Sequence, residues 1–289
     1  MIRPAFVDKA GMPNESLSAA DFDRLRSLIY TESGINLNQE KKTMLEVRLR
    51  RRLHSLHFSS CAEYCAYLFG PGAGDRELVH LIDAVATNKT DFFREPDHFE
   101  HLTARALPDL DARNGPDRRS LVWSAGCSTG EEPYTLAMVL SEYAQGHAGF
   151  RFGVLATDLS TAVLDKARMG IFKTEVVRPV PVNLRKKYLM RSRDPASDLN
   201  RIVPELRAKV EFRRLNFMDA DYGLSETPGI VFCRNVIIYF NRQTQEQLLE
   251  KLVRQLAPGG YFFAGHSESL QSMNLPLVTA GPAVYRKCG

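Results

Sequence analysis

The second half of the chain alternates short apolar runs with amphipathic helical segments, and this alternation constrains the fold more than any other feature. From residue 120 onward, five runs have the length of strands: SLVWSAG, FGVLATD, KVEFRRLNF, GIVFCRNVIIYF and GGYFFAGH. Helical patterns such as PYTLAMVLSEYA and QTQEQLLEKLVRQLA separate them. Apolar strands with helices between them are typical of a parallel sheet covered by helices on both faces. The sequence therefore predicts an α/β domain over residues 120–289.

Two features depart from the simple alternation. The closing segment AVYRK follows a Gly-Pro turn, so we expect an antiparallel strand at or near the edge of the sheet. From about residue 173 to residue 211, the chain is too long for an ordinary connection between a helix and a strand. We interpret this stretch as an insertion that forms a small subdomain.

The first part of the chain has a different texture. Residues 1–17 carry Pro, Gly, Asn and Ser with little periodicity and are interpreted as a loose arm. A helix is predicted next, because Ser18 and Asp21 have capping-box spacing, and Gly34 is expected to end it. A second helix is predicted from an apolar stripe formed by Leu45, Leu49, Leu53 and Leu56. With two more short helical patterns, residues 18–86 are predicted to form a small all-helical domain.

Composition excludes several classes of protein. With 44% hydrophobic and 25% charged residues, a chain of 289 residues can bury a substantial core. The five cysteines include no CxxC pair and the histidines lack HExxH or HxH spacing, so neither a disulfide framework nor a metal site is expected. No apolar run has the length of a membrane span and the first residues lack a secretory signal, so we expect a cytoplasmic protein without membrane insertion.

Positive charge is concentrated in the second helical pattern. The segment KKTMLEVRLRRRLH holds six Lys or Arg against one Glu, a charge of +5, whereas the whole chain has +4. Charge alone leaves three interpretations open: a solvated face, a contact with nucleic acid, or a docking surface for an acidic protein.

The strand-loop-helix segment VWSAGCSTGEEPYTLAM is the strongest candidate for a site. Gly126 and Gly130 flank a short polar loop that lets the backbone approach a ligand before Pro133 begins the next helix. The glycines could also just fit a tight turn. The loop is not the GxGxxG of a pyrophosphate site, and two glutamates stand where phosphates would bind. Carboxylates at this position repel phosphate and favour a cation.

Polar residues also follow the later strands. Asp158 ends the second strand, where an acid accepts both ribose hydroxyls of a nucleoside, although a helix N-cap would also explain it. Asn216 follows the third strand, suited to an adenine edge, while Arg234 and Asn235 follow the fourth. Asn235 could instead bond loop backbone. The two glutamates of the first loop and Asp158 together indicate a nucleoside whose far end is positively charged, the shape of S-adenosylmethionine.

Five motifs in order then carry a resemblance: TNKTDFFRE, WSAGCSTGEEPYTLAM, ATDLSTAVLDKARMGIF, FCRNVIIYF and LAPGGYFFAGHSESL. Over residues 18 to 287 the chain resembles the chemotaxis receptor methyltransferases, the CheR family. The resemblance implies an all-helical N-terminal domain followed by a Rossmann-like, S-adenosylmethionine-dependent methyltransferase domain with a small inserted β-subdomain. It also implies methyl transfer to glutamate side chains of chemoreceptors, giving glutamyl methyl esters and S-adenosylhomocysteine for sensory adaptation.

The resemblance implies roles for individual residues. The implied cofactor-binding set is Asn88, Thr90, Arg94, Gly126, Glu132, Asp158, Asn216, Phe217, Arg234 and Asn235. Within it, Glu132 would bind the methionine amino group and Asp158 the ribose. Arg94 and Tyr239 would act on the substrate carboxylate, although Tyr239 could equally be a core aromatic.

The segment TNKTDFFREPDHF, at the start of residues 87–119, is interpreted as part of a linker and cofactor lid. Its amide and hydroxyl groups can bond the cofactor, Phe92 and Phe93 can anchor it, and Arg94 can face a carboxylate. The alternative is a linker helix whose phenylalanines are core residues, which we accept for at least one of them.

The resemblance also bears on partners. It favours docking of Arg48, Arg51 and Arg52 on the Glu-rich helical bundle of a receptor. The segment RSRDPASDL lacks the glycine-rich turn of members that bind a receptor C-terminal pentapeptide, so that tether is not expected here. We expect the protein to be a monomer and not to bind nucleic acid. Two alternatives stay open: a methyltransferase for another acceptor such as RNA, although no NPPY motif or aromatic-rich basic surface supports it, and an inactive adaptor.

Overall fold

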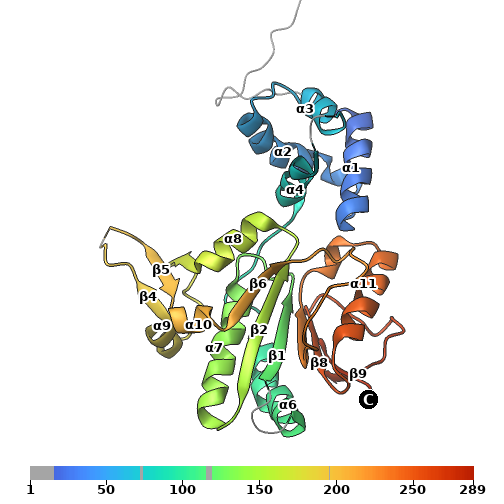
Figure 1. Cartoon of the computed structure of the whole chain (residues 1–289). Coiled ribbons are helices and arrows are strands. Elements are labelled where there is room, and N and C mark those ends of the chain that lie inside the picture. The colour runs from blue at the N-terminus through green and yellow to red at the C-terminus, as the bar shows by residue number, and fades with distance from the viewer. Residues whose placement is uncertain (1–15, 72–73, 115–118, 195) are drawn as a thin grey trace, which may run out of the picture. The chain divides into compact units, whose positions relative to one another are not determined.

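The computed structural model describes residues 16–71, 74–114, 119–194 and 196–289. The chain divides into a helical unit, residues 1–87 with 239–241, and a larger unit, residues 88–238 with 242–289 (Figure 1). Of the arm expected over residues 1–17, all but the last two residues lie outside the described part. No helix in the described ranges combines the length and apolarity needed to cross a membrane.

The helical unit is built from short amphipathic helices. Its elements are α1 (Ala19–Ser33), the 3-10 turn η1 (Gln39–Lys41), α2 (Lys42–Leu56), α3 (Cys61–Leu68) and α4 (Gly74–Val85). The predicted limits of α1 are confirmed, because the Ser18 hydroxyl accepts the Asp21 amide at 3.0 Å and Gly34 ends the helix with φ +74°. Of the α2 stripe, Leu45, Leu49 and Leu53 are buried, as expected for a core-facing row.

The larger unit contains a seven-stranded sheet. Its strands are β1 (Arg119–Ala125), β2 (Arg151–Asp158), β6 (Val210–Arg214), β7 (Ile230–Cys233), β8 (Tyr261–Ala264), β9 (Leu277–Gly281) and β10 (Val284–Lys287). The order is β6-β2-β1-β7-β8-β10-β9; the first five are parallel, and β10 runs antiparallel to both its neighbours. The antiparallel strand predicted near the edge is therefore confirmed as β10, while the edge strand β9 was not anticipated.

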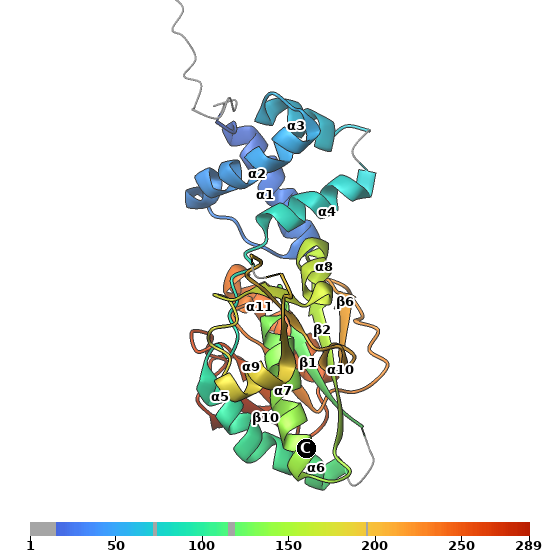
Figure 2. The same ribbon diagram turned by 90° about the vertical axis from the view of Figure 1, so that its left-hand side faces the viewer.

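Helices cover both faces of this sheet. They are α5 (Pro96–His101), the π-helical segment Leu102–Ala106, α6 (Leu107–Asn114), α7 (Glu131–Gly146), α8 (Thr161–Met169) and α11 (Arg242–Gln255). The 3-10 turn η3 (Ile237–Tyr239) precedes α11 in the chain. Crossovers lead from β1 to β2 through α7 and from β7 to β8 through α11, and connections of this kind are right-handed as a rule. Because these run in opposite directions along the sheet, α7 and α11 lie on opposite faces (Figures 1 and 2).

The insertion forms a second, small sheet. Strands β3 (Ile171–Lys173), β4 (Leu189–Arg191) and β5 (Leu199–Ile202) pair antiparallel in the order β3-β5-β4, with the short helices α9 (Val182–Tyr188) and α10 (Pro204–Arg207). Phe172 and Ile202 are buried in the main core, which fixes this sheet to the larger domain. The predicted architecture, a parallel α/β domain with a small inserted β-subdomain after an all-helical domain, is confirmed.

Candidate cofactor and active site

The candidate site lies where strands β1, β2 and β7 end. The strand order reverses at β1, because β2 and β6 lie on one side of it and β7 and β8 on the other. In open parallel sheets, ligands bind outside the carboxyl ends of the strands at this reversal. The chain places Gly126, Asp158 and Arg234 directly after or at the ends of these three strands.

The loop after β1 is held close to the end of β2. The amides of Gly126 and Cys127 both donate to the Thr157 carbonyl, at 2.8 and 2.9 Å. Gly126 has φ +89°, and a Cβ added there would lie 2.5 Å from a methyl of Val236, so this position requires glycine.

The start of the next helix differs from the prediction. Helix α7 begins at Glu131 after Gly130, which has φ +100°, so Pro133 is the third helical residue and not the first. Glycine can take this left-handed conformation at the N-cap and thereby begin the helix two residues early. Both acidic residues consequently belong to the first turn of α7.

Asp158 fastens two loops. One oxygen of its carboxylate accepts the Ser128 amide at 2.8 Å and the other accepts the Ser160 amide at 2.9 Å. The N-cap of α8 is Ser160, whose hydroxyl accepts the Val163 amide, so the alternative that Asp158 caps this helix is wrong. The ribose role of Asp158 stays a prediction.

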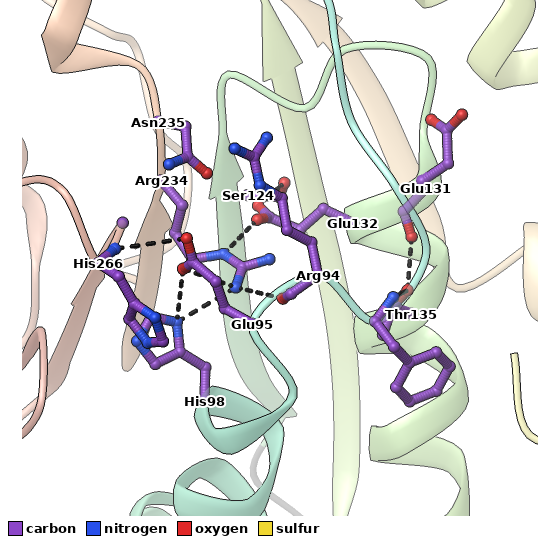
Figure 3. Close-up of polar contacts among 12 residues, drawn as sticks. Arg94, Glu95, His98, Ser124, Glu131, Glu132, Thr135, Arg234, Asn235 and His266 are labelled. Atoms are coloured by element: carbon purple, nitrogen blue, oxygen red, sulfur yellow. Dashed lines mark hydrogen bonds and ion pairs between the residues drawn. The ribbon is translucent and has the colours of Figure 1, made fainter. Parts of the chain in front are cut away.

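A buried ion pair joins the end of β7 to the first turn of α7. Arg234 Nε lies 2.7 Å from one oxygen of Glu132, and the Ser124 hydroxyl donates to the other at 2.7 Å (Figure 3). The guanidinium also donates through Nη1 to the main-chain carbonyl of Arg94, at 2.7 Å. Arg234 therefore connects Glu132 to the backbone of the predicted lid.

The predicted lid is irregular backbone from Thr87 to Glu95, so the linker-helix alternative is wrong for this stretch. Phe92 is 1% exposed and meets the Phe172 ring edge-on, which confirms a core role for one phenylalanine. The amide of Phe93 donates to the Thr135 hydroxyl at 3.2 Å. Farther upstream, the carbonyl of Asn88 accepts the Ser128 hydroxyl at 2.8 Å.

Unusual backbone conformations concentrate around these contacts. The described residues include six non-glycine positions with positive φ, and four of them lie here: Phe93 (+54°), Glu95 (+56°), Ser128 (+50°) and Asn235 (+57°). Each such residue costs about 1–3 kcal/mol and persists only where its surroundings enforce it. Such strain is typical of functional sites, and the hydrogen bonds above supply the enforcement.

His98 lies against the ion pair as a neutral imidazole. It is 1% exposed, and its Nδ1 is 3.2 Å from Arg234 Nη1. Burial, and then the positive charge of Arg234, lower the pKa of His98 to about 4. Ligand atoms of Glu95, His98 and His266 lie within 4.8 Å of one another, but the cation at this place is the guanidinium of Arg234. The expectation of no metal stays a prediction.

Glu131 is the first of the two glutamates noted in the sequence, but sequence reasoning assigned it no individual role. Figure 3 shows its carboxylate pointing away from the Glu132–Arg234 pair. The Thr129 hydroxyl donates to it at 2.6 Å, and burial raises its pKa. Among the described residues it has no cationic partner, whereas Glu132 has one. The first turn of α7 thus offers two acidic groups in different electrostatic states.

The structure places the other predicted cofactor residues in the larger unit. Asn216 Oδ1 accepts the Met218 amide at 3.0 Å, and Phe217 packs edge-on against Tyr222. Thr90 is half-buried in the lid, and the amide of Asn235 donates to Glu268 at 2.8 Å.

Tyr239, the second predicted catalytic residue, groups with the helical unit. Its carbonyl accepts the Asn36 amide at 2.9 Å. It is not among the buried core residues, and its catalytic role stays a prediction.

The three arginines proposed for docking differ in their surroundings. Arg48 donates to the carbonyls of Val85 and Ala86 at the end of α4, the second at 3.1 Å. Arg52 forms a bidentate pair with the buried Glu77, at 3.0 and 2.5 Å. Arg51 is exposed. Two of the three arginines are thus engaged in holding the helical unit together.

Several site residues had no signal in the sequence. Ser124, His98 and Glu268 stand at no recognisable spacing from the groups they bond. Their partners are 8, 136 and up to 33 residues away. The doubled glutamate of EEPY was the one available signal for Glu131.

Comparison with known proteins fits this geometry. Residues 88–282 match the family model described as CheR methyltransferase, SAM binding domain, and residues 20–86 match CheR methyltransferase, all-alpha domain. A chemotaxis protein methyltransferase of Borreliella burgdorferi is 38% identical over 95% of this chain and 96% of its own. Chemotaxis protein methyltransferase 2 of Pseudomonas aeruginosa is 40% identical over 92% of both chains. The Escherichia coli chemotaxis protein methyltransferase is 38% identical over 93% of this chain and 91% of its own.

The fold and the strand-end site define a Rossmann-like, S-adenosylmethionine-dependent methyltransferase. The side chains present fit that cofactor: a glycine whose Cβ would fill the loop, an acid at the end of β2, and carboxylates rather than phosphate ligands at the start of α7. The chain belongs to the CheR methyltransferase family.

Proposed function

We propose that this protein transfers the methyl group of S-adenosylmethionine to glutamate side chains of chemoreceptors, giving methyl esters for sensory adaptation. The main support for this proposal comes from the contacts of Arg94. Its carbonyl is held by the buried Arg234, while its guanidinium bonds the Lys89 carbonyl at 3.2 Å and pairs with no carboxylate among the described residues. A fixed backbone thus presents a cation suited to an acidic acceptor.

The cofactor residues are proposed from the arrangement of the strand ends. Asp158 would take the ribose, while Asn216 and Phe217 would take the adenine side. The methionine end would lie against the first turn of α7, where Glu132 would bind its ammonium. Glu132 already shares its charge with Arg234 at 2.7 Å, so the neighbouring Glu131 is a second candidate for this role.

Bound S-adenosylmethionine supplies an electrophilic methyl group on a positively charged sulfur. A glutamate acceptor has a pKa of about 4.3 and is already an anion at neutral pH, so no general base is required. Its oxygen forms the new C–O bond as the C–S bond breaks, and the two opposite charges disappear without proton transfer. The chain contributes orientation and exclusion of water, together on the order of several kcal/mol.

Arg94 would orient the acceptor carboxylate. The catalytic role implied for Tyr239 stays a prediction. Replacement Arg94→Ala should lower turnover at least about 100-fold, because positioning of the reacting atoms is lost. Calorimetry should show an affinity for S-adenosylhomocysteine within a few-fold of the wild-type value. Arg105→Ala, at an exposed arginine in the π-helical segment, is the matched control and should leave both quantities unchanged.

The assay uses receptor cytoplasmic fragments and labelled methyl groups. A carboxyl ester releases its label as methanol in mild base, whereas a methylated base in RNA retains it. An unchanged rate in Arg94→Ala would remove the role of Arg94, and base-stable label would remove the proposed acceptor. Absence of cofactor binding by the wild-type chain would favour the inactive adaptor.

The proposed partner surface is the exposed part of α2. The net positive charge of this helix suits the acidic helical bundle of a receptor. Because Arg48 and Arg52 are engaged within the unit, we propose that Arg51 makes the largest direct contribution to docking. We propose no pentapeptide tether, because the segment RSRDPASDL lacks a glycine-rich turn, and a monomer remains the expected state.

A further inference from the structure

Glu268 is a buried acid to which sequence reasoning gave no role. It follows strand β8 and is 3% exposed. It forms no ion pair among the described residues, and its carboxylate instead accepts main-chain amides. One oxygen takes the amides of Asn235 and Gly265, both at 2.8 Å, and the other takes the amide of Ile237 at 3.0 Å.

These amides belong to two loops at the carboxyl edge of the sheet. Asn235 and Ile237 follow β7, and Gly265 follows β8. One side chain therefore joins the two loops at the point where the predicted cofactor residues of β7 lie. The bonds use both carboxylate oxygens, so a group with a single acceptor oxygen cannot replace them all.

The loop after β7 needs such a restraint. Asn235 has φ +57°, a conformation that L-residues adopt at a cost. A Cβ added at Gly265 would lie 2.6 Å from the Asn235 side-chain nitrogen and 2.8 Å from the Glu268 carboxylate, so the neighbouring loop closes tightly on it. The Asn235 side-chain amide has no hydrogen-bond partner among the described residues, so this restrained turn presents an unused polar group.

We propose that Glu268 is a positioning residue of the cofactor site: its carboxylate fixes the left-handed turn at Asn235 and so presents the Asn235 side chain to the cofactor. This rests on the cofactor-binding role proposed for Asn235. Burial raises the pKa of Glu268, and its hydrogen bonds to main-chain amides oppose that change. No cation pairs with this carboxylate among the described residues, so main-chain N–H groups hold it.

The test is Glu268→Gln in the full chain. Glutamine keeps the shape of the glutamate side chain, but one of its two oxygens is replaced by an NH2 group. At least one of the three main-chain amides then faces a donor instead of an acceptor. The matched control is Glu77→Gln in the helical unit. Glu77 is 2% exposed and likewise buried, and it accepts the Tyr64 hydroxyl at 2.8 Å and pairs with Arg52. Affinity for S-adenosylhomocysteine is measured by calorimetry, and amide exchange at Asn235, Ile237 and Gly265 by NMR.

Glu268→Gln is expected to weaken binding about tenfold or more and to speed amide exchange in the two loops, since at least one buried amide loses its acceptor. Glu77→Gln is expected to lower the melting temperature without changing either readout. Unchanged binding in Glu268→Gln, or retained protection at all three amides, would overturn the proposal.

The variant Asn235→Ala distinguishes the positioning role of Glu268 from the cofactor-binding role of Asn235, on which it rests. Weak binding in Asn235→Ala beside normal binding in Glu268→Gln would reject the positioning role alone. Normal binding in Asn235→Ala would remove the proposed role of Asn235, and the positioning role with it.

Discussion

The helical unit and the sheet edge each contain a buried glutamate paired with an arginine, and the two pairs serve different ends. Arg52 and Glu77 join α2 to α4, with Tyr64 as a third member, and no residue of this group has positive φ. Arg234 and Glu132 join the end of β7 to the first turn of α7, and Arg234 also bonds the backbone of the predicted lid, beside four strained residues. The chemistry of the pair does not distinguish a structural site from a functional one. The strained backbone and unpaired polar groups around it do.

Replacing the arginine of each pair should have the largest effect on stability, and the effect on cofactor binding should differ between the two regions. In Arg234→Met the buried Glu132 loses its counter-charge and the lid loses its tie, so we expect about 3–5 kcal/mol of lost stability together with loss of cofactor binding. Arg52→Met should also destabilise the protein, by less because Arg52 is 21% exposed, while binding of S-adenosylhomocysteine is retained. Denaturant unfolding and calorimetry measure both. Equal loss of binding in the two variants would break the comparison.

Substitutions of glycine test whether the strained backbone at the sheet edge is required for cofactor binding. In Gly126→Ala the new Cβ would meet Val236 at 2.5 Å in a residue with φ +89°, so we expect roughly 2–4 kcal/mol of lost cofactor binding or stability. Gly146→Ala is the control, since its Cβ would meet nothing within 4 Å at the end of α7. It should be neutral or stabilising by up to about 1 kcal/mol. Normal binding in Gly126→Ala would show that the loop has room to relax.

The pH dependence of stability tests the neutral state of His98. Its pKa falls to about 4 in the folded protein, below the value of about 6.5 expected in the unfolded chain. The unfolded state therefore binds the proton more readily, so the contribution of His98 is full above pH ~6.5 and is lost as the pH falls toward ~4, by at most roughly 3 kcal/mol.

Unfolding free energies of the wild-type protein and of His98→Asn, measured across this range, give the contribution by difference. We expect the wild type to lose more stability on acidification than the variant. Parallel curves would mean that His98 titrates normally. The sheet edge would then lack the neutral acceptor that its geometry indicates.

The smallest effect is expected on the exposed face of α2. Arg51→Glu should change stability by no more than about 0.5 kcal/mol, because the side chain is exposed, yet raise the Michaelis constant for a receptor fragment. Arg76→Glu on the exposed surface of α4 is a control for charge alone. Equal Michaelis constants in Arg51→Glu and the wild type would remove the docking proposal for this residue.

The sequence was informative where a property depends on residues close together in the chain. Strand and helix periodicity predicted the α/β domain, and capping chemistry at Ser18 and Gly34 predicted the limits of α1. Two start signals were misjudged: Pro133 was given the first helical position, and Asp158 was allowed as an N-cap that is in fact Ser160. Both errors concern a choice between neighbouring residues, where local preferences are nearly equal.

By itself, the sequence determined the two-domain order, the strand ends of the candidate site and the chemical type of the cofactor, because period, turn chemistry and motif spacing are local properties. Only the tertiary structure decided which charges neutralise one another. It paired Glu132 with Arg234 across 102 residues, left Glu131 without a cation among the described residues, and committed Arg52 to Glu77. It also assigned Glu268 to the amides of a loop about 30 residues away. Such pairings depend on how strands are ordered in the sheet and helices packed, which no local pattern encodes.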